Sequence, residues 1–370
     1  MEKKTNIFAL TKQDTAVLKG IAVVAMLMHH LWGCAPSWVE PYTGVLGFFG
    51  SVGKVCVAIF LFCSGYGLSV GYSKVVEDCR LNNEDWKNKV KTTLKFLAKR
   101  FVKFYSGYWP IFFIFVPLGV FVFDRPLNAS YGEHVNILKR LLLDIVGVQG
   151  YQSYNITWWF NKLIILLYLT FPVLYFCVKK GGWFFALISL ICMRFSDRLD
   201  GINYYGILLW QCPMVLGILW HEKEQCFDKM KLQRKWMLYM LSVVAVVLLM
   251  TLLLYRYGIV PHIPHVESGI YMDSIIVVVM TLCVVLMRNY CKHNNVIVNL
   301  LGRHSMNTYL THTFFFSYWF PSSFYSCELG GGINVVALLM ICTLASIIIE
   351  WLKEKCKWNK LTNIILEKID

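Results

Sequence analysis

Residues 236–255, WMLYMLSVVAVVLLMTLLLY, form a stretch of twenty residues without a charged side chain. An α-helix needs about 20 apolar residues to cross the hydrocarbon core of a bilayer, because each residue rises about 1.5 Å. Similar stretches recur from one end of the chain to the other, and short polar or basic segments separate them. The sequence therefore predicts an all-α, polytopic membrane protein.

The composition supports the same fold class. Of the 370 residues, 57% are hydrophobic and 16% are charged, and the mean hydropathy is +0.53. Soluble domains contain roughly 45 to 50% apolar residues. No internal repeat and no Ser-, Gly- or Pro-rich linker divides the chain. We therefore expect a single transmembrane domain over residues 1–370.

Ten transmembrane helices are predicted, and their charged flanks suggest an orientation. The predicted spans are residues 17–33, 52–72, 101–123, 157–178, 183–195, 202–220, 236–255, 270–287, 305–320 and 333–351. With the N-terminus in the cytoplasm, most of the 36 Lys and Arg residues fall on inner segments. Such a bias is typical of membrane proteins. It predicts a multi-pass protein with both termini cytoplasmic, and we expect this protein in the plasma membrane.

The net charge of +14 does not indicate a nucleic-acid partner, because the basic residues lie in separated segments beside the spans. Their densest run, residues 74–103, is predicted to be cytoplasmic, where contact with anionic membrane lipid is its ordinary use. The thirteen cysteines form no CxxC pair and show no spacing typical of a metal site, so no metal is predicted. Cys34 and Cys327 fall on predicted outer segments, and whether they pair stays open.

Ionisable side chains within the spans are candidates for function, because they are costly in a bilayer and usually face the protein interior. They are Lys19, His29, His30, Lys162, Asp273 and His312. On a regular helix, the steps from Lys19 to His30 add up to three turns and about 20°, with a rise of roughly 16 Å. The two side chains then share a face, and His29 is rotated about 80° from it. The alternative for His30 is a buried imidazole that bonds a neighbouring helix.

A series of motifs surrounds these residues in order along the chain. They are Lys19–Gly20 followed by His30, FLFCSGYGL at 60–68, KRFVKFYSGYW at 99–109, TWWF at 157–160 with FP at 171–172, PMVLGIL at 213–219, and LGRHSMNTYLTH at 301–312. In this series the chain resembles the acyltransferase-3 family of membrane O-acyltransferases, over nearly its whole length. Lys19 and Lys103 stand where the family has Arg, so the two-pronged contact of a guanidinium is lost there.

The resemblance implies an O-acyltransferase, most simply an O-acetyltransferase. Such an enzyme takes an acyl group from cytoplasmic acyl-CoA, with acetyl-CoA as the usual donor, and places it on a hydroxyl of an extracytoplasmic or lipid-linked carbohydrate. The implied catalytic residue is His30. The implied donor-binding residues are Lys19, Arg100 and Lys103. The predicted substrate-binding residues are Ser64, Tyr66, Trp158, Trp159 and His312. The implied partners are membrane lipid, the carbohydrate acceptor and polysaccharide-assembly proteins.

The residue types suit this chemistry, and each has an ordinary alternative. An imidazole accepts a hydroxyl proton near neutral pH, and cations complement the phosphates of CoA. Without the motif, Arg100 and Lys103 are better explained by positive-inside anchoring, and a Trp pair at a span end is ordinary in the interfacial aromatic belt. Ser64 suits either a covalent acyl relay or close helix packing. For His312, a packing role competes with a place on the acceptor side.

A transporter or flippase of a glycan or lipid precursor, without covalent chemistry, is the competing function. Such folds tend to show inverted repeats and intramembrane carboxylates. The sequence shows no repeat and few buried acids. Because the sequence ends at Asp370, soon after the last predicted span, we expect transfer to be completed by the membrane domain or by a separate protein.

Overall fold

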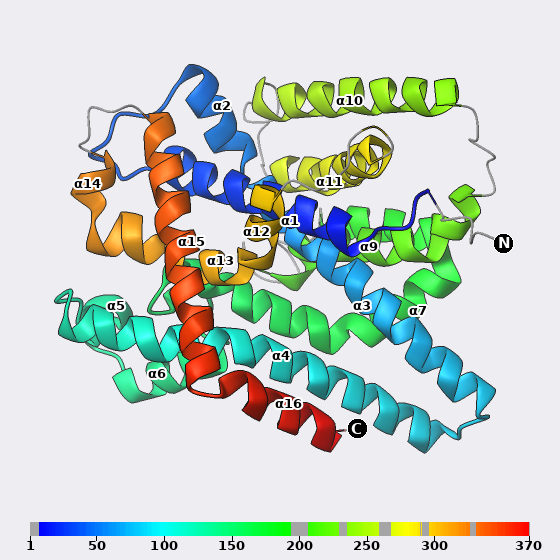
Figure 1. The fold of residues 1–370 in the computed structure, drawn as a ribbon, viewed down its shortest axis with the longest axis horizontal. Helices are drawn as coiled ribbons and strands as arrows, with labels where there is room; N and C mark the ends of the chain where they lie inside the picture. Colours follow the sequence, from blue (N-terminus) through cyan, green and yellow to red (C-terminus); the bar gives the residue numbers. More distant parts are fainter. Residues whose placement is uncertain are drawn as a thin grey trace. The chain divides into compact units, whose positions relative to one another are not determined.

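The computed structural model describes residues 7–193, 206–228, 235–258, 268–288, 290, 296–325 and 331–369. It is 86% helical, and no strand occurs in this part of the chain (Figure 1). The all-α prediction is confirmed. The helices group into two compact units, each built from two segments of the chain.

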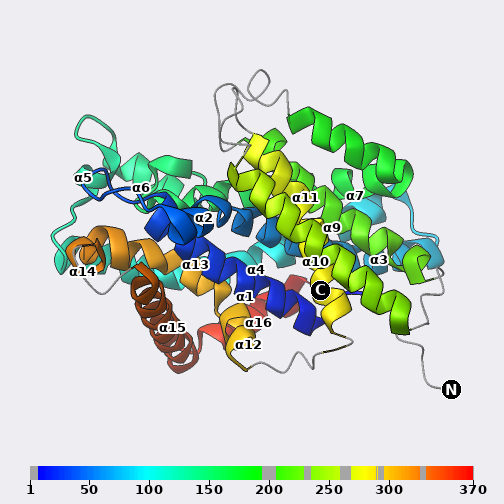
Figure 2. The ribbon, with the colours of Figure 1, turned by 90° about the horizontal axis from the view of Figure 1, so that it is seen from above.

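Unit 1 consists of Met1–Val70 and Val173–Arg303. Its elements are α1 (Lys12–Met28), the π-helical turn η1 (His29–Gly33), α2 (Gly44–Val52), the first part of α3 (Val55–Leu81), the last part of α7 (Trp159–Met193), α9 (Ile207–Asp228), α10 (Lys235–Gly258), α11 (Ser268–Met287) and α12 (Val296–Arg303). Within this unit α10 lies along α11, as both overall views show (Figure 1, Figure 2).

Unit 2 consists of Gly71–Pro172 and His304–Asp370. Besides the remaining parts of α3 and α7, its elements are α4 (Trp86–Phe121), α5 (Leu127–Tyr131), α6 (Ile137–Val146), the short 3₁₀ turns η2 (Gly150–Gln152) and η3 (Ile156–Trp158), α13 (Ser305–Thr313), the π-helical turn η5 (Phe314–Trp319), α14 (Pro321–Tyr325), α15 (Gly331–Lys355) and α16 (Trp358–Ile369). Within it, α4 packs against α13 and α16.

Seven helical stretches of the described residues are long and apolar enough to cross a bilayer. The predicted number of ten is not confirmed. The described parts of predicted spans 157–178 and 183–195 lie on either side of Gly182, within η3 and α7. At Gly182 the backbone is not helical (φ 51°, ψ −127°), a conformation that glycine adopts readily, so α7 consists of two helical parts that meet at this residue. Predicted span 305–320 is the short pair α13 and η5. Predicted span 202–220 begins outside the described residues and continues as α9.

The start of α1 is set by a capping box. The Thr11 hydroxyl accepts the Asp14 N–H at 3.1 Å, and the Asp14 carboxylate accepts the Thr11 N–H at 2.8 Å. These bonds satisfy backbone donors that a helix start leaves without partners. Further along, α1 packs against α12, where a Cβ added to Gly302 would lie 2.3 Å from the Ala16 carbonyl oxygen. The Leu-Gly motif at 301–302 therefore allows two backbones to touch.

A second close contact joins α3 to α9 and yields a prediction about stability. A Cβ added to Gly65 would lie 2.2 Å from the Met214 carbonyl oxygen, whereas one added to Gly67 would meet nothing within 4 Å. Gly65→Ala is therefore expected to lower the free energy of unfolding by about 1 to 3 kcal/mol through overpacking. Gly67→Ala, on the same helix, is the control and is expected to be neutral or stabilising by up to about 1 kcal/mol.

The measurement is the melting temperature of the two purified variants and the wild type in detergent. If the melting temperature of Gly65→Ala equals or exceeds that of Gly67→Ala, the backbones of α3 and α9 are not packed closely enough at Gly65 to exclude a methyl group.

Candidate functional site

The predicted site residues divide between the two units. Unit 1 contains Lys19, His30, Ser64 and Tyr66, and unit 2 contains Arg100, Lys103, Trp158, Trp159 and His312.

In unit 1, Lys19 and His30 are both carried by the first membrane helix and its π turn. Both side chains are half-buried. Lys19 interacts electrostatically with Cys63 of α3, the residue before Ser64. The structure thus places the Lys19 position beside the FLFCSGYGL motif, from which it is separated in sequence. The regular α-helix ends at Met28, and the π turn starts at His29. Such turns are frequent at functional sites.

The two adjacent histidines have different surroundings. The Nδ1 atom of His29 lies 2.8 Å from the Gly50 carbonyl oxygen, and its Nε2 atom lies 3.5 Å from Cys34 Sγ. A carbonyl can only accept, so Nδ1 carries a proton, and Nε2 of the neutral ring accepts from the thiol. The rings of His29 and His30 are 5.3 Å apart and inclined at 59°. His29 is thus fixed by two contacts and forms one wall against the His30 ring.

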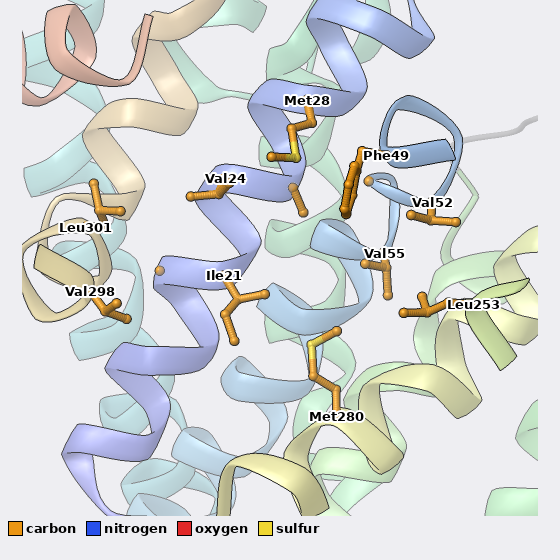
Figure 3. A pocket seen from close by; sticks show the side chains of 13 residues that line it. Ile21, Val24, Met28, Phe49, Val52, Val55, Leu253, Met280, Val298 and Leu301 are labelled. Carbon is orange, nitrogen blue, oxygen red and sulfur yellow. The ribbon is translucent and has the colours of Figure 1, made fainter. Parts of the chain in front are cut away.

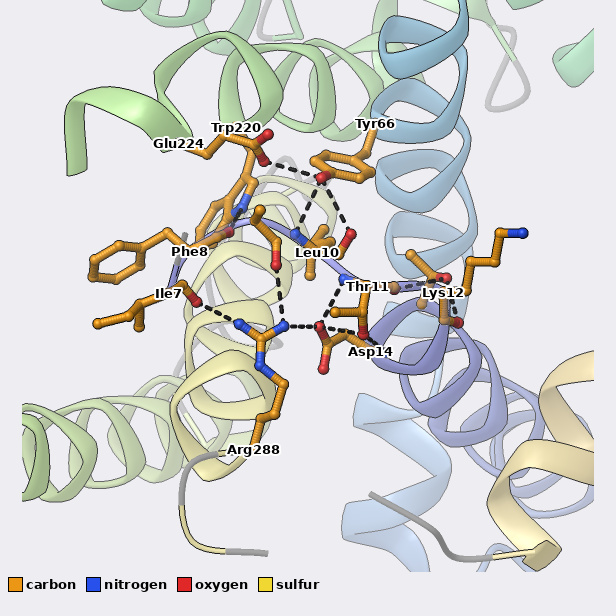
Figure 4. Close-up of polar contacts among 12 residues, drawn as sticks. Ile7, Phe8, Leu10, Thr11, Lys12, Asp14, Tyr66, Trp220, Glu224 and Arg288 are labelled. Carbon is orange, nitrogen blue, oxygen red and sulfur yellow. Dashed lines mark hydrogen bonds and ion pairs between the residues drawn. The ribbon is translucent and has the colours of Figure 1, made fainter. Parts of the chain in front are cut away.

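Residues 7–11, which precede α1, are held by an arginine and form what we call the N-terminal strap (Figure 4). The Arg288 guanidinium donates to the carbonyl oxygens of Ile7 at 2.7 Å and Ala9 at 3.1 Å. It also pairs with Asp14 Oδ2 at 2.5 Å. Trp220 of α9 donates from its indole nitrogen to the Phe8 carbonyl at 2.9 Å. The strap is therefore fixed to α9 and to the end of α11.

Tyr66, a predicted substrate-binding residue, also contacts the strap. Its hydroxyl accepts from the Leu10 N–H at 3.1 Å and lies 3.0 Å from Glu224 Oε2, to which it can donate. The side chain is only 6% exposed. In this conformation the Tyr66 hydroxyl links α3, α9 and the strap. Sequence reasoning did not anticipate this, because Leu10 and Glu224 lie 56 and 158 positions away.

A group of charged side chains lies near His29 in unit 1. Arg256 donates from Nε to Asp273 Oδ1 at 3.1 Å, and these residues are 8% and 0% exposed. The Lys54 ammonium lies 5.7 Å from the centre of the Trp210 ring. Asp273, one of the ionisable residues predicted within the spans, is thus paired with Arg256. Arg256 was not among the ionisable residues predicted within the spans, because the predicted span ends at residue 255.

An apolar groove of about 330 Å³ runs beside α1 (Figure 3). Helices α1, α2, α3, α10, α11 and α12 all contribute to its lining, and each of the lining side chains is apolar. Its α1 wall includes Ile21, Val24 and Met28. These residues repeat at three- and four-residue intervals, as the positions of one helix face do.

In unit 2 the two tryptophans of the TWWF motif differ. Trp158 is 1% exposed, its indole nitrogen donates to the Leu310 carbonyl at 3.0 Å, and its ring packs 5.2 Å from that of Tyr108. Trp159 is half-buried. Only Trp159 of the pair therefore has exposed surface in this unit.

His312 is fully buried within a chain of hydrogen bonds in unit 2. Its Nδ1 atom donates to the Tyr309 carbonyl at 2.8 Å, and its Nε2 atom lies 3.3 Å from the Thr313 hydroxyl. That hydroxyl lies 3.1 Å from the Thr157 hydroxyl, which donates to Asn155 Oδ1 at 2.8 Å. The network joins α13 to the turn η3, which precedes α7. It fixes the His312 tautomer, since a carbonyl takes the Nδ1 proton.

The predicted donor-binding cations of unit 2 lie on α4. The Arg100 guanidinium lies over Phe96, 5.4 Å from the ring centre, and it interacts electrostatically with Tyr168. Lys103, nearly one turn further along, is exposed. Among the residues that the structure describes, no group of three or more His, Cys, Asp or Glu side chains is arranged to hold a metal ion.

Asp144 anchors the predicted outer segment of unit 2, between α4 and α7. Its carboxylate accepts from the Tyr154 N–H at 2.6 Å and from the Tyr131 hydroxyl at 2.8 Å. Burial raises the pKa of this carboxyl from its ordinary value of 3.8 to about 6, although the two hydrogen bonds act in the opposite direction. The residue therefore ties α5, α6 and the turn before α7 together.

Comparison with protein-family models matches residues 16–353 to the acyltransferase-3 model, described as an acyltransferase domain. The matched region covers nearly the whole chain and includes every predicted site residue. No curated protein and no solved structure matches the chain.

The strap gives a prediction for Tyr66. In Tyr66→Phe, the Leu10 N–H and the Glu224 carboxylate lose their hydrogen bonds to the Tyr66 hydroxyl. The free energy of unfolding is therefore expected to fall by about 1 to 3 kcal/mol. Tyr239→Phe, on an exposed position of α10, is the control and is expected to change nothing. Thermal unfolding and substrate titrations of both variants provide the measurement. An unchanged melting temperature with weakened substrate affinity would instead support the substrate-binding role.

Asp144 gives a prediction for pH. Because the folded-state pKa of about 6 lies above the ordinary 3.8, folding favours the protonated carboxyl. The contribution of Asp144 to the free energy of unfolding is therefore expected to be fully present below about pH 4 and to be lost as pH rises through about 6, by up to about 3 kcal/mol in total. Asp144→Asn should remove this part of the slope, and Glu133→Gln, an exposed neighbour, should keep it. Melting temperatures measured from pH 4 to pH 8 would show both, and equal slopes in the two variants would exclude Asp144 as the cause.

Proposed function

The chain belongs to the acyltransferase-3 family, and from this we propose that it is a membrane O-acyltransferase of extracytoplasmic or lipid-linked carbohydrate. The proposed donor is cytoplasmic acyl-CoA, with acetyl-CoA as the first candidate. The proposed location is the plasma membrane, with polysaccharide-assembly proteins as partners. Membership of the family and the apolar helices support acyl transfer within a membrane.

The observation that carries the proposal is the composition of the first membrane helix. Lys19 lies on α1, and His30 lies in the π turn that continues it. A regular helix over these residues would separate them by about 16 Å along its axis. The helix is long enough to cross a bilayer. This spacing suits a cytoplasmic donor whose phosphates need a cation and an acceptor hydroxyl that needs a base deeper in the membrane.

In the proposed reaction, the oxygen of the acceptor hydroxyl attacks the thioester carbonyl while His30 accepts the proton of that hydroxyl. Collapse of the tetrahedral intermediate forms the ester and breaks the carbon–sulfur bond, and the CoA sulfur leaves with the proton that His30 returns. General base catalysis of this kind contributes roughly 10²- to 10⁴-fold. Lys19 in unit 1, and Arg100 and Lys103 in unit 2, are the proposed contacts for donor phosphates.

A transporter or flippase remains the second candidate. The observation that favours it is the buried pair Arg256 and Asp273, since intramembrane ion pairs also mark substrate pathways in transporters. Release of CoA that depends on acceptor would distinguish the enzyme, because transport alone breaks no thioester.

The test uses the purified full-length protein with acetyl-CoA and candidate glycans, following CoA release and acylated glycan by mass spectrometry. We expect His30→Ala to reduce transfer by about 10²- to 10⁴-fold while the melting temperature stays close to that of the wild type. His29→Asn is the matched control. Its amide can still donate to the Gly50 carbonyl, so it should keep most of the activity. Transfer by His30→Ala at the wild-type rate would exclude His30 as the base, and loss confined to His29→Asn would assign the base to His29.

A further inference from the structure

The groove beside α1 has the properties of a site for a hydrocarbon chain. Its volume of about 330 Å³ falls within the roughly 300 to 1,000 Å³ of small-molecule sites. Along α1 it extends from Gly20 to Met28, about 12 Å of helix. Four of the helices that line it can cross a bilayer. A groove that is wholly apolar and lies among membrane helices meets hydrocarbon, and it offers water no hydrogen bond.

The charges near His29 have the properties of an anion site. Arg256 and Lys54 supply two cations, and Asp273 supplies one carboxylate in electrostatic contact with both. The guanidinium of Arg256 reaches Asp273 through Nε, and within the described chain its Nη1 and Nη2 atoms have no hydrogen-bond partner. The side chain is nevertheless 90% buried. A net positive charge that includes a buried guanidinium with donors left open is suited to an oxyanion.

The groove and the charges adjoin along three separate elements. On α1, the groove residue Met28 directly precedes His29. Between α2 and α3, the groove residues Gly53 and Val55 flank Lys54. On α10, the groove residue Leu253 lies about one turn before Arg256. One end of the groove therefore lies next to the cations. His29 interacts electrostatically with both Lys54 and Arg256, and its ring contacts that of His30.

We propose that unit 1 binds a membrane lipid with a phosphate head, its hydrocarbon chain in the groove along α1 and its phosphate at Lys54 and Arg256. This inference rests on the proposed function for its biological meaning, since the bound lipid would be the carrier of the carbohydrate acceptor. A sugar attached to that phosphate lies on the side of His29 and His30. The site thus selects a lipid-linked acceptor over a free polysaccharide.

The experiment measures binding to the full-length protein in detergent, by native mass spectrometry and by the shift in melting temperature. The probes are dodecyl phosphate, dodecanol, which lacks the head, and inorganic phosphate, which lacks the chain. Dodecyl phosphate is expected to bind one site and to raise the melting temperature, and each of the other two is expected to bind at least 10-fold more weakly. Equal binding of dodecanol would overturn the anion site, and equal binding of inorganic phosphate would overturn the groove.

Variants test the two halves of the site separately. Val24→Trp fills the groove, and the double variant Arg256→Gln with Asp273→Asn removes the cation without leaving a buried carboxylate. Each is expected to weaken dodecyl phosphate binding by about 10- to 100-fold. Leu344→Trp, on an exposed apolar position of α15, is the control for added bulk and is expected to bind like the wild type. Lys54→Gln provides an independent test of the anion site if the double variant does not fold.

Wild-type binding by folded Val24→Trp, or by folded variants of both Arg256 and Lys54, would overturn the proposal. His30→Ala is expected to bind dodecyl phosphate normally. If the protein binds dodecyl phosphate but transfers acyl groups to no acceptor, the proposed function is contradicted and the lipid site is supported. If it transfers acyl groups but does not bind dodecyl phosphate, the proposed function is supported and the lipid site is contradicted.

Discussion

Asp14 fixes the start of α1 through two interactions at once. Its carboxylate closes the capping box with Thr11 and pairs with Arg288, while the same arginine holds the strap through two carbonyl groups. Asp14 is fully buried, so the ion pair is not weakened by solvent as a surface pair would be. At the other end of the helix, His29 is bound to the Gly50 carbonyl. Because both ends of α1 are fixed, the separation of Lys19 and His30 is set by the helix between them.

The features that the sequence predicted are those that a local pattern encodes. Apolar runs of about twenty residues indicate membrane helices because hydrocarbon leaves no other way to satisfy the backbone, and the all-α fold follows. The motif series predicted the family, which the match over residues 16–353 confirms. The span count was less secure, because hydropathy does not show whether two apolar runs are joined directly or through a loop. Within α7, two helical parts meet at the non-helical residue Gly182.

The site contacts that the sequence did not predict join residues far apart in the chain. Asp14 and Arg288 are 274 positions apart, and Tyr66 and Glu224 are 158 apart. Each residue alone has an ordinary explanation at a span end or on an apolar helix, so no local pattern indicates the pair. Arg256 shows the same problem, since its position after an apolar run is typical of topogenic charge. Its 8% exposure and its contact with Asp273 appear only when α10 and α11 are folded together.

The two adjacent histidines illustrate how one turn can separate a structural role from a chemical one. Both ring nitrogens of His29 are engaged, Nδ1 by the Gly50 carbonyl that fixes the end of α1 and Nε2 by the Cys34 thiol, so a substrate proton taken at Nε2 would displace the thiol. A regular helix places neighbouring side chains about 100° apart, and the π turn begins at this pair. His29 can therefore point to α2 while His30 points elsewhere from the same turn. Fixing the first ring limits the motion of the second, which is what a base needs if it is to meet a hydroxyl in one geometry.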